Sequence, residues 1–137
     1  MHPDLEKKIN FHLPALITVF TLILLFGVAW NVGRARGKYK IDAPATTGHP
    51  KFELAYRVQM NTVENAVAFI PALWLYAYYV NATWAGVLGA VWLLGRVWYA
   101  VAYSSDATKR GPGFGLSMLA FVVLTVGALI GIVRQML

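Results

Sequence analysis

Three polar side chains of residues 55–80 share one face of the helix that this segment is expected to form. Arg57, Asn61 and Glu64 fall within about 60° of arc, because each helical residue advances by about 100°. Asn65 follows directly after them. Charged groups in an apolar span are costly, and they normally face the interior of a helix bundle or a water-filled site. This face therefore predicts one wall of a polar cavity.

A second polar stripe lies in residues 82–103. Arg96, Tyr99 and Tyr103 fall within about 80° of arc, and Arg110 joins this face if the helix continues. Together the two stripes supply three arginines, two tyrosines, two amides and one glutamate. Such a cavity suits a small polar ligand that is anionic in sum and carries an amine for the glutamate, such as a peptide-like molecule with two carboxylates.

Simpler explanations cover parts of this pattern. Arg57 and Glu64 would neutralise each other as an ion pair that holds the bundle together, but an ion pair does not need five further aligned polar residues. Gln59 points to nearly the opposite side of the helix, at a depth where an unpaired amide is costly. It either faces another subunit, whose stripe it completes, or lies hydrated at the membrane surface.

The composition indicates a membrane protein. Of 137 residues, 58% are hydrophobic and 13% are charged, whereas soluble domains carry about 25% charged residues. The apolar content excludes intrinsic disorder. The absence of cysteine excludes disulfides, thiolate metal sites and a cysteine nucleophile, and His2, His12 and His49 have no metal-ligand spacing. The net charge of +6 fits cytoplasmic loops better than nucleic-acid binding.

Four apolar segments are long enough to cross a bilayer as helices, which takes about 20 residues each. They are residues 11–33, 55–80, 82–103 and 114–134. We expect a true loop over 33–52, because proline and glycine break the helix there, and a stop at 111–113. The prediction is an all-α membrane protein, a four-transmembrane-helix antiparallel bundle that forms a single domain over 1–137.

Loop charges predict the orientation of a multi-pass protein. The first and third connections, with the start of the second helix, carry eight basic residues, which are Arg34, Arg36, Lys38, Lys40, Lys51, Arg57, Lys109 and Arg110. The charges of residues 4–8 balance, and the second connection has none. Both basic connections are therefore expected in the cytoplasm, and both termini on the other side.

Two motifs resemble those of a known membrane family. Residues 52–65, FELAYRVQMNTVEN, resemble the arginine–x–glutamine/histidine–x–asparagine–x–x–glutamate signature of the MAPEG family, the membrane-associated proteins in eicosanoid and glutathione metabolism. Residues 95–103, followed by 109–110, resemble its third-helix motif, and residues 44–48 and Arg36 also match without gaps. The resemblance covers nearly the whole chain and is closest to the microsomal glutathione transferases.

The resemblance implies a homotrimer of four-helix protomers that binds glutathione in a bent form between adjacent subunits. The motif positions carry five glutathione-binding residues over to one subunit, which are Arg57, Asn61, Glu64, Tyr99 and Tyr103. Arg36 and Gln59 would reach in from the neighbouring subunit. Arg110 occupies the position that activates the thiol in catalytic members, and Arg96 is assigned to the glutathione site with a less defined role.

Glutathione would supply the thiol that this chain lacks. A free thiol has a pKa near 8.5, and only the thiolate is a good nucleophile. A guanidinium stabilises the thiolate without losing its own proton. We therefore expect a detoxifying glutathione transferase that conjugates apolar electrophiles from the bilayer, with reduction of lipid hydroperoxides as a second reaction. No metal is expected. The expected location is a bacterial inner membrane, with the site toward the cytoplasm.

Two other functions fit parts of the sequence. A non-catalytic, lipid-presenting scaffold of the same family would not need the constellation that ends in Arg110. A small proton-coupled multidrug exporter would use Glu64 as a proton relay but would not need the arginine–tyrosine stripe. Asn65 stands where eicosanoid-forming members have a tyrosine, and Gly37 where they have a second arginine. General glutathione transfer is therefore favoured over leukotriene synthesis.

Overall fold

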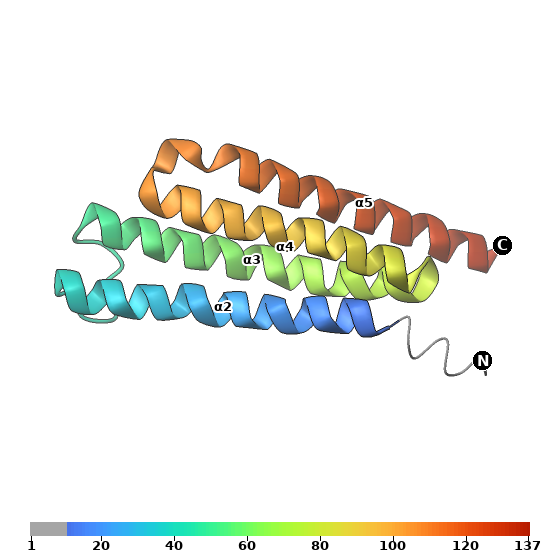
Figure 1. The fold of residues 1–137 in the computed structure, drawn as a ribbon, viewed down its shortest axis with the longest axis horizontal. Coiled ribbons are helices and arrows are strands. Elements are labelled where there is room, and N and C mark those ends of the chain that lie inside the picture. Colours follow the sequence, from blue (N-terminus) through green and yellow to red (C-terminus); the bar gives the residue numbers. More distant parts are fainter. Residues whose placement is uncertain (1–10) are drawn as a thin grey trace.

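The computed structural model describes residues 11–137 as an antiparallel bundle of four long helices (Figure 1). These are α2 (His12–Tyr39), α3 (Pro50–Tyr79), α4 (Ala82–Ser105) and α5 (Gly111–Met136), with a short 3-10 helix, η1 (Ala107–Lys109), before α5. The all-α, four-helix prediction is confirmed. His2 and the amino-terminal charges of residues 4–8 lie outside the described residues.

The first connection is shorter than the sequence predicted. Helix α2 continues to Tyr39, and Lys40 ends it in the left-handed conformation, at φ 57°. Helix α3 already begins at Pro50, where a missing N–H costs nothing in the first turn, and the His49 side chain accepts a hydrogen bond from the Lys51 N–H. The loop predicted over 33–52 is therefore corrected to residues 40–49.

The segment Gly111-Pro112-Gly113 also has a different role from the predicted stop. Helix α5 begins at Gly111, and Pro112 stands in its first turn. A proline ring is compatible with helical geometry there, because its φ angle is already helical and its nitrogen needs no partner. The segment starts the last helix rather than delaying it, and this places Arg110 directly at the helix start.

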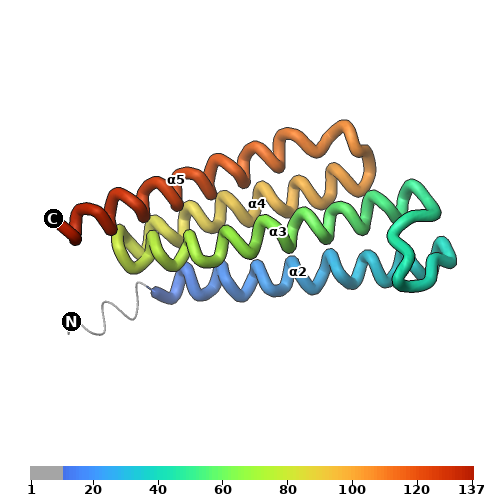
Figure 2. The backbone as a smooth tube through the Cα atoms, turned by 180° about the vertical axis from the view of Figure 1, so that it is seen from behind, coloured from blue at the N-terminus to red at the C-terminus, as the bar shows by residue number. Residues whose placement is uncertain are grey.

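The two ends of the bundle differ in character. The α2–α3 loop and the α4–α5 connection lie together at one end, while the carboxyl terminus and the start of α2 lie at the other (Figures 1 and 2). The predicted basic connections are these same two segments. The structure therefore collects the loop charges at one end of the molecule, as the sequence predicted.

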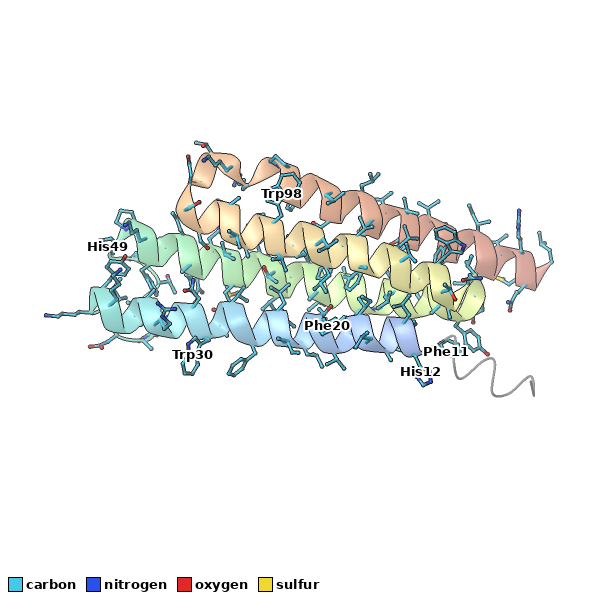
Figure 3. The ribbon with its side chains drawn as sticks, viewed as in Figure 1. Phe11, His12, Phe20, Trp30, His49 and Trp98 are labelled. Atoms are coloured by element: carbon cyan, nitrogen blue, oxygen red, sulfur yellow. The ribbon has the colours of Figure 1, made fainter. Side chains whose placement is uncertain are left out.

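The outer surface is suited to lipid. Three segments within residues 11–137 are long and apolar enough to span a membrane: His12–Tyr39, Ala82–Ser105 and Ala107–Met136. Large apolar side chains, including Phe20, Trp30 and Trp98, are exposed along the bundle (Figure 3). The chain is an integral membrane protein. Helix α3 is more polar than the other three, and its membrane crossing stays a prediction from its place in the bundle.

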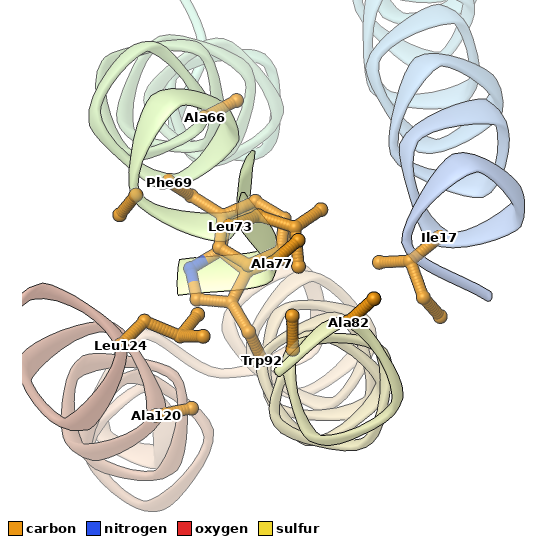
Figure 4. Close-up of a cluster of buried hydrophobic side chains, with 11 residues drawn as sticks. Ile17, Ala66, Phe69, Leu73, Ala77, Ala82, Trp92, Ala120 and Leu124 are labelled. Atoms are coloured by element: carbon orange, nitrogen blue, oxygen red, sulfur yellow. The ribbon is translucent and has the colours of Figure 1, made fainter. Parts of the chain in front are cut away.

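Aromatic packing fills the half of the bundle near the termini. The rings of Phe69 in α3 and Trp92 in α4 stack with their centroids 3.7 Å apart and an interplanar angle of 1°. Leu73 and Leu124 are fully buried beside them (Figure 4). The buried side chains of this cluster are apolar, whereas the buried polar residues of α3 and α4, Thr62 and Arg96, lie toward the basic loops.

Two glycines bring α4 and α5 into backbone contact near the polar half. A Cβ added to Gly113 would lie 2.5 Å from the Tyr99 backbone nitrogen, and one added to Gly95 would lie 2.8 Å from the Ser117 nitrogen. Such distances leave no room for a methyl group, because a backbone atom cannot rotate away as a side chain can. This close approach sets the distance between Tyr99 and the start of α5.

We predict that Gly113→Ala destabilises the bundle by about 1–3 kcal/mol, the usual cost of overpacking a close contact. Gly115→Ala is the matched control, because nothing lies within 4 Å of an added Cβ there. Alanine at this helical position is expected to be neutral or slightly stabilising. Thermal unfolding in detergent measures both variants, and equal melting temperatures for the two would contradict the backbone contact.

Candidate functional site

The guanidinium of Arg96 is the buried centre of the polar half. Arg96 is 0% exposed. Its Nη2 donates hydrogen bonds to Asn61 Oδ1 at 2.9 Å and to Thr62 Oγ1 at 2.8 Å. The guanidinium also lies over the Tyr99 ring, 4.2 Å from the ring centroid. Arg96 of α4 therefore contacts α3 through two neutral oxygens and packs on the Tyr99 ring of its own helix.

Asn61 accepts a second hydrogen bond on the same side-chain oxygen. The Nδ2 of Asn65, one turn further along α3, donates to Asn61 Oδ1 at 3.2 Å and to the Asn61 backbone carbonyl at 2.8 Å. The Asn61 oxygen thus accepts from both Arg96 and Asn65. Its amide is held at a fixed orientation on the wall of the site.

Stacked aromatic rings continue the site along α4. Tyr99 and Tyr103 are four residues apart and both buried, and their rings stack with centroids 5.4 Å apart. The Arg110 guanidinium lies over the Tyr103 ring, 6.0 Å from its centroid. A continuous row of contacts therefore runs from Asn61 through Arg96 and the two tyrosines to Arg110.

An open cavity of about 300 Å³ lies beside this row. It is lined by Asn61 from α3, Tyr99 from α4, and Arg110, Gly111 and Phe114 at the start of α5. Arg110 is exposed to it and to solvent. The cavity thus offers an amide, a phenol, a positive charge and an aromatic ring.

A short turn holds Arg110 at the cavity. The carboxylate of Asp106 accepts hydrogen bonds from the Thr108 N–H at 2.9 Å and from the Thr108 hydroxyl at 2.8 Å, and these begin η1. Both bonds favour the ionised form and lower the pKa of the Asp106 carboxyl below its ordinary value. The turn is therefore most stable at neutral pH.

The side chains of Arg57 and Glu64 lie on the outer surface of the protomer and not in its interior. Both are exposed, and seven residues separate them, which is about 10 Å along a helix. The buried residues Ala66 and Leu73 lie nine positions beyond them, about 180° around α3. The predicted charged stripe therefore includes Asn61 at its inner edge, while its two charges face away from the protomer's core.

Arg36 has hydrogen-bond partners in its own protomer, whereas Gln59 is only partly enclosed by it. Gln59 is half-buried, beside the buried Val58. Arg36 donates from Nη1 to the carbonyls of Ile41 at 3.3 Å and Ala45 at 2.8 Å, and its guanidinium lies 4.9 Å from the centroid of the Phe52 ring. Arg36 thus closes the α2–α3 loop, and the assignment of both residues to a neighbour's site stays a prediction.

Sequence reasoning missed Thr62 and Phe114. Thr62 is fully buried as an acceptor for Arg96, but an uncharged threonine about 100° away from Asn61 gave no signal in a search for polar stripes. Phe114 lines the cavity from the first turn of α5, and a single apolar residue at the start of a span gave no sign of a site. Within residues 11–137, no group of three or more metal-ligating side chains gathers.

Comparison with known proteins places these residues in a wider context. A model of the MAPEG family matches residues 14–130. Uncharacterized protein sll1147 of Synechocystis is 50% identical over 123 residues, which cover 90% of this chain and 90% of that protein. Microsomal glutathione S-transferase 2 of Homo sapiens is 39% identical over 128 residues, which cover 93% of this chain and 87% of that protein. Leukotriene C4 synthase of Cavia porcellus is 31% identical over 123 residues, which cover 90% of this chain and 82% of that protein.

We predict that Asp106→Ala loosens the turn before Arg110, because the Thr108 donors lose their acceptor. Trypsin, which cuts after Lys109 and Arg110, should then cleave the native protein severalfold faster at neutral pH. Asp106→Asn keeps an acceptor oxygen but loses the charge, so its cleavage rate should lie between those of Asp106→Ala and wild type. Since the carboxyl pKa is lowered in the fold, the turn should also loosen as pH falls through that pKa.

Equal cleavage rates for Asp106→Ala and wild type would contradict this role. Hydrogen exchange of residues 104–110 between neutral and acidic pH provides a second reading that does not depend on the protease. Faster exchange at neutral pH than at acidic pH, after correction for the intrinsic rates, would contradict the pH direction.

Proposed function

The chain belongs to the MAPEG family, and we propose that it is a membrane-bound glutathione transferase that ionises the glutathione thiol for attack on apolar electrophiles. The observation that carries the proposal is the unbroken row of contacts from Asn61 through Arg96 to Arg110 beside a cavity. The names of two relatives, a glutathione S-transferase and a leukotriene C4 synthase, support glutathione as the co-substrate.

The charge of the site suits an anionic tripeptide. Glutathione carries two carboxylates, one ammonium and one thiol. The cavity offers the Arg110 guanidinium, the Asn61 amide and the Tyr99 phenol, and Arg57 and Glu64 on the exposed face of α3 would add a second guanidinium and a carboxylate where a neighbouring subunit closes the site. Arg57 and Arg110 would attract the carboxylates and the sulfur, while Glu64 would bind the ammonium. The site would thereby orient the peptide before any chemistry takes place.

Arg110 would act on the sulfur. Only the thiolate is a good nucleophile, and a free thiol is mostly protonated at neutral pH. A guanidinium near the sulfur favours ionisation, and each unit removed from the thiol pKa corresponds to about 1.4 kcal/mol. The thiolate then attacks an electrophilic carbon, so that the C–S bond forms, the leaving group departs with its electron pair, and the thiol proton passes to water.

The site is proposed to be shared between subunits of a homotrimer. Arg57 and Glu64 are charged and exposed on the face of α3 that points away from its own core. Charges in that position within a bilayer need water or another protein surface against them. Both hydrogen bonds of Arg36 use Nη1, so its other guanidinium donors are available to a neighbour's ligand. Gln59 would reach the same neighbour.

The second substrate would enter from the lipid. An apolar hollow of about 490 Å³ lies on α2, lined by Phe26, Trp30 and Arg34 among others, at the end of the bundle that holds the basic loops. An apolar electrophile or a lipid hydroperoxide would partition into this region from the membrane. Because basic loops face the cytoplasm, the thiol site would open to cytoplasmic glutathione, in a bacterial inner membrane, with detoxification as the role.

We predict that Arg110→Ala lowers the turnover of glutathione conjugation with a chlorinated nitrobenzene by about 100-fold or more, while glutathione affinity changes only a few-fold. The reason is that a group which stabilises the thiolate acts mainly in the chemical step. Absorbance of the conjugate gives the rate, and calorimetry with glutathione gives the affinity in the same detergent preparation.

Arg134→Ala is the control for that experiment, because Arg134 is an exposed arginine at the opposite end of α5. Its activity should match wild type. Conjugation by Arg110→Ala at the wild-type rate would contradict the role of Arg110. A wild-type protein that neither conjugates nor binds glutathione would contradict the proposed function altogether.

We also predict three chains in the detergent-solubilised particle, because the exposed charges of α3 need a partner surface. Native mass spectrometry measures the number directly. Mixed particles of Arg36→Ala and Arg110→Ala protomers should be more active than either variant alone, since each mixed trimer retains one complete site. A monomer with full activity would contradict the shared site.

A further inference from the structure

We propose that Arg96 is a positioning residue for glutathione, which acts by fixing the orientation of the Asn61 amide and does not touch the ligand itself. The inference rests on the proposed function of the site. Arg96 has no exposed surface, whereas Asn61 and Tyr99, the two side chains in front of it, both line the cavity. A ligand in the cavity would therefore meet these two residues first.

The hydrogen-bonding chemistry of a guanidinium determines which way Asn61 points. Arginine has five N–H donors and no acceptor, so the amide atom that faces Arg96 must be the oxygen. Asn65 donates to the same Oδ1 at 3.2 Å, so both lone pairs of that oxygen are engaged. The Asn61 NH₂ group is then left with its two N–H donors on the cavity side, where a carboxylate or carbonyl of the peptide would accept them.

Without Arg96 the Asn61 oxygen would keep only the longer hydrogen bond from Asn65, at 3.2 Å, and would lose the shorter, charge-assisted one at 2.9 Å. The two ends of an asparagine amide are nearly equal in size, so the group rotates more readily when the remaining partner distinguishes the oxygen from the nitrogen only weakly. An Asn61 that turned its oxygen to the cavity would repel a carboxylate instead of binding it. Tyr99 is less dependent on Arg96, because its ring also packs against Tyr103 and Phe114.

The burial of Arg96 separates this role from a purely structural one. Its partners are neutral, and its Nε and Nη1 are buried without a hydrogen-bond partner among the described residues. Leaving such donors unsatisfied is costly, and exchange of buried charged groups for apolar ones of similar volume is often neutral or stabilising. A methionine in place of Arg96 should therefore preserve the fold and impair only the site.

A double-mutant cycle tests the proposal on the full chain in detergent. Calorimetry gives the glutathione affinity of wild type, Arg96→Met, Asn61→Ala and the double variant. Each single variant should weaken binding about tenfold, and the double variant should bind no more weakly than Asn61→Ala, because Arg96 acts through Asn61. At saturating glutathione, the kcat of Arg96→Met should stay within about twofold of wild type, with the loss confined to KM.

Other results would overturn the assignment. Wild-type affinity in Arg96→Met, or losses that multiply to about 100-fold in the double variant, would mean that Arg96 does not act through Asn61. If Arg96→Met does not fold, Arg96→Lys decides: it keeps a charged donor for the Asn61 oxygen, so near-wild-type affinity supports the proposal and a tenfold loss contradicts it. Failure of wild type to bind glutathione would instead count against the proposed function.

Discussion

The guanidinium of Arg96 is removed from water between two helices, and the polar half of the bundle is arranged around it. A buried charge needs protein dipoles in place of its hydration, and here an amide oxygen and a hydroxyl oxygen serve Nη2 while an aromatic face covers the guanidinium plane, with Nε and Nη1 left without a partner among the described residues. The two oxygens belong to α3, so their hydrogen bonds connect Arg96 of α4 to α3 at this level. The same contacts orient Asn61 and Tyr99 toward the cavity, so the buried guanidinium also shapes the binding site.

The rest of the fold provides the rigidity that this arrangement needs. The stacked pair of Phe69 and Trp92 holds α3 against α4 in the apolar half, and the close approach at Gly95 and Gly113 holds α5 against α4. Arg110 therefore begins α5 at a defined place beside Tyr103. By contrast, Arg57 and Glu64 of α3 are exposed and face away from the protomer's core, which is the physical reason to propose a second subunit against them.

Sequence reasoning predicted the number, direction and polar faces of the helices, because hydropathy and the 100° rotation per residue determine these locally. It misplaced helix ends, since Pro50 and Pro112 read as helix breakers although each stands in a first turn, where proline is favoured. It placed Arg96 on the polar face of its helix but did not predict that Arg96 is fully buried. Periodicity shows which way a side chain points around the helix axis, and not how deeply neighbouring helices cover it. Thr62 was missed for a related reason: its importance comes from a neighbour on another helix.

The most direct test of this account is the ultraviolet difference spectrum of glutathione bound to the purified protein, recorded across pH, because thiolate and thiol absorb differently. The account predicts that bound glutathione shows the thiolate signal at neutral pH, well below the ordinary pKa of a thiol near 8.5, and that Arg110→Ala removes this signal while the peptide stays bound. Bound glutathione that ionises at the same pH as the free peptide would contradict it.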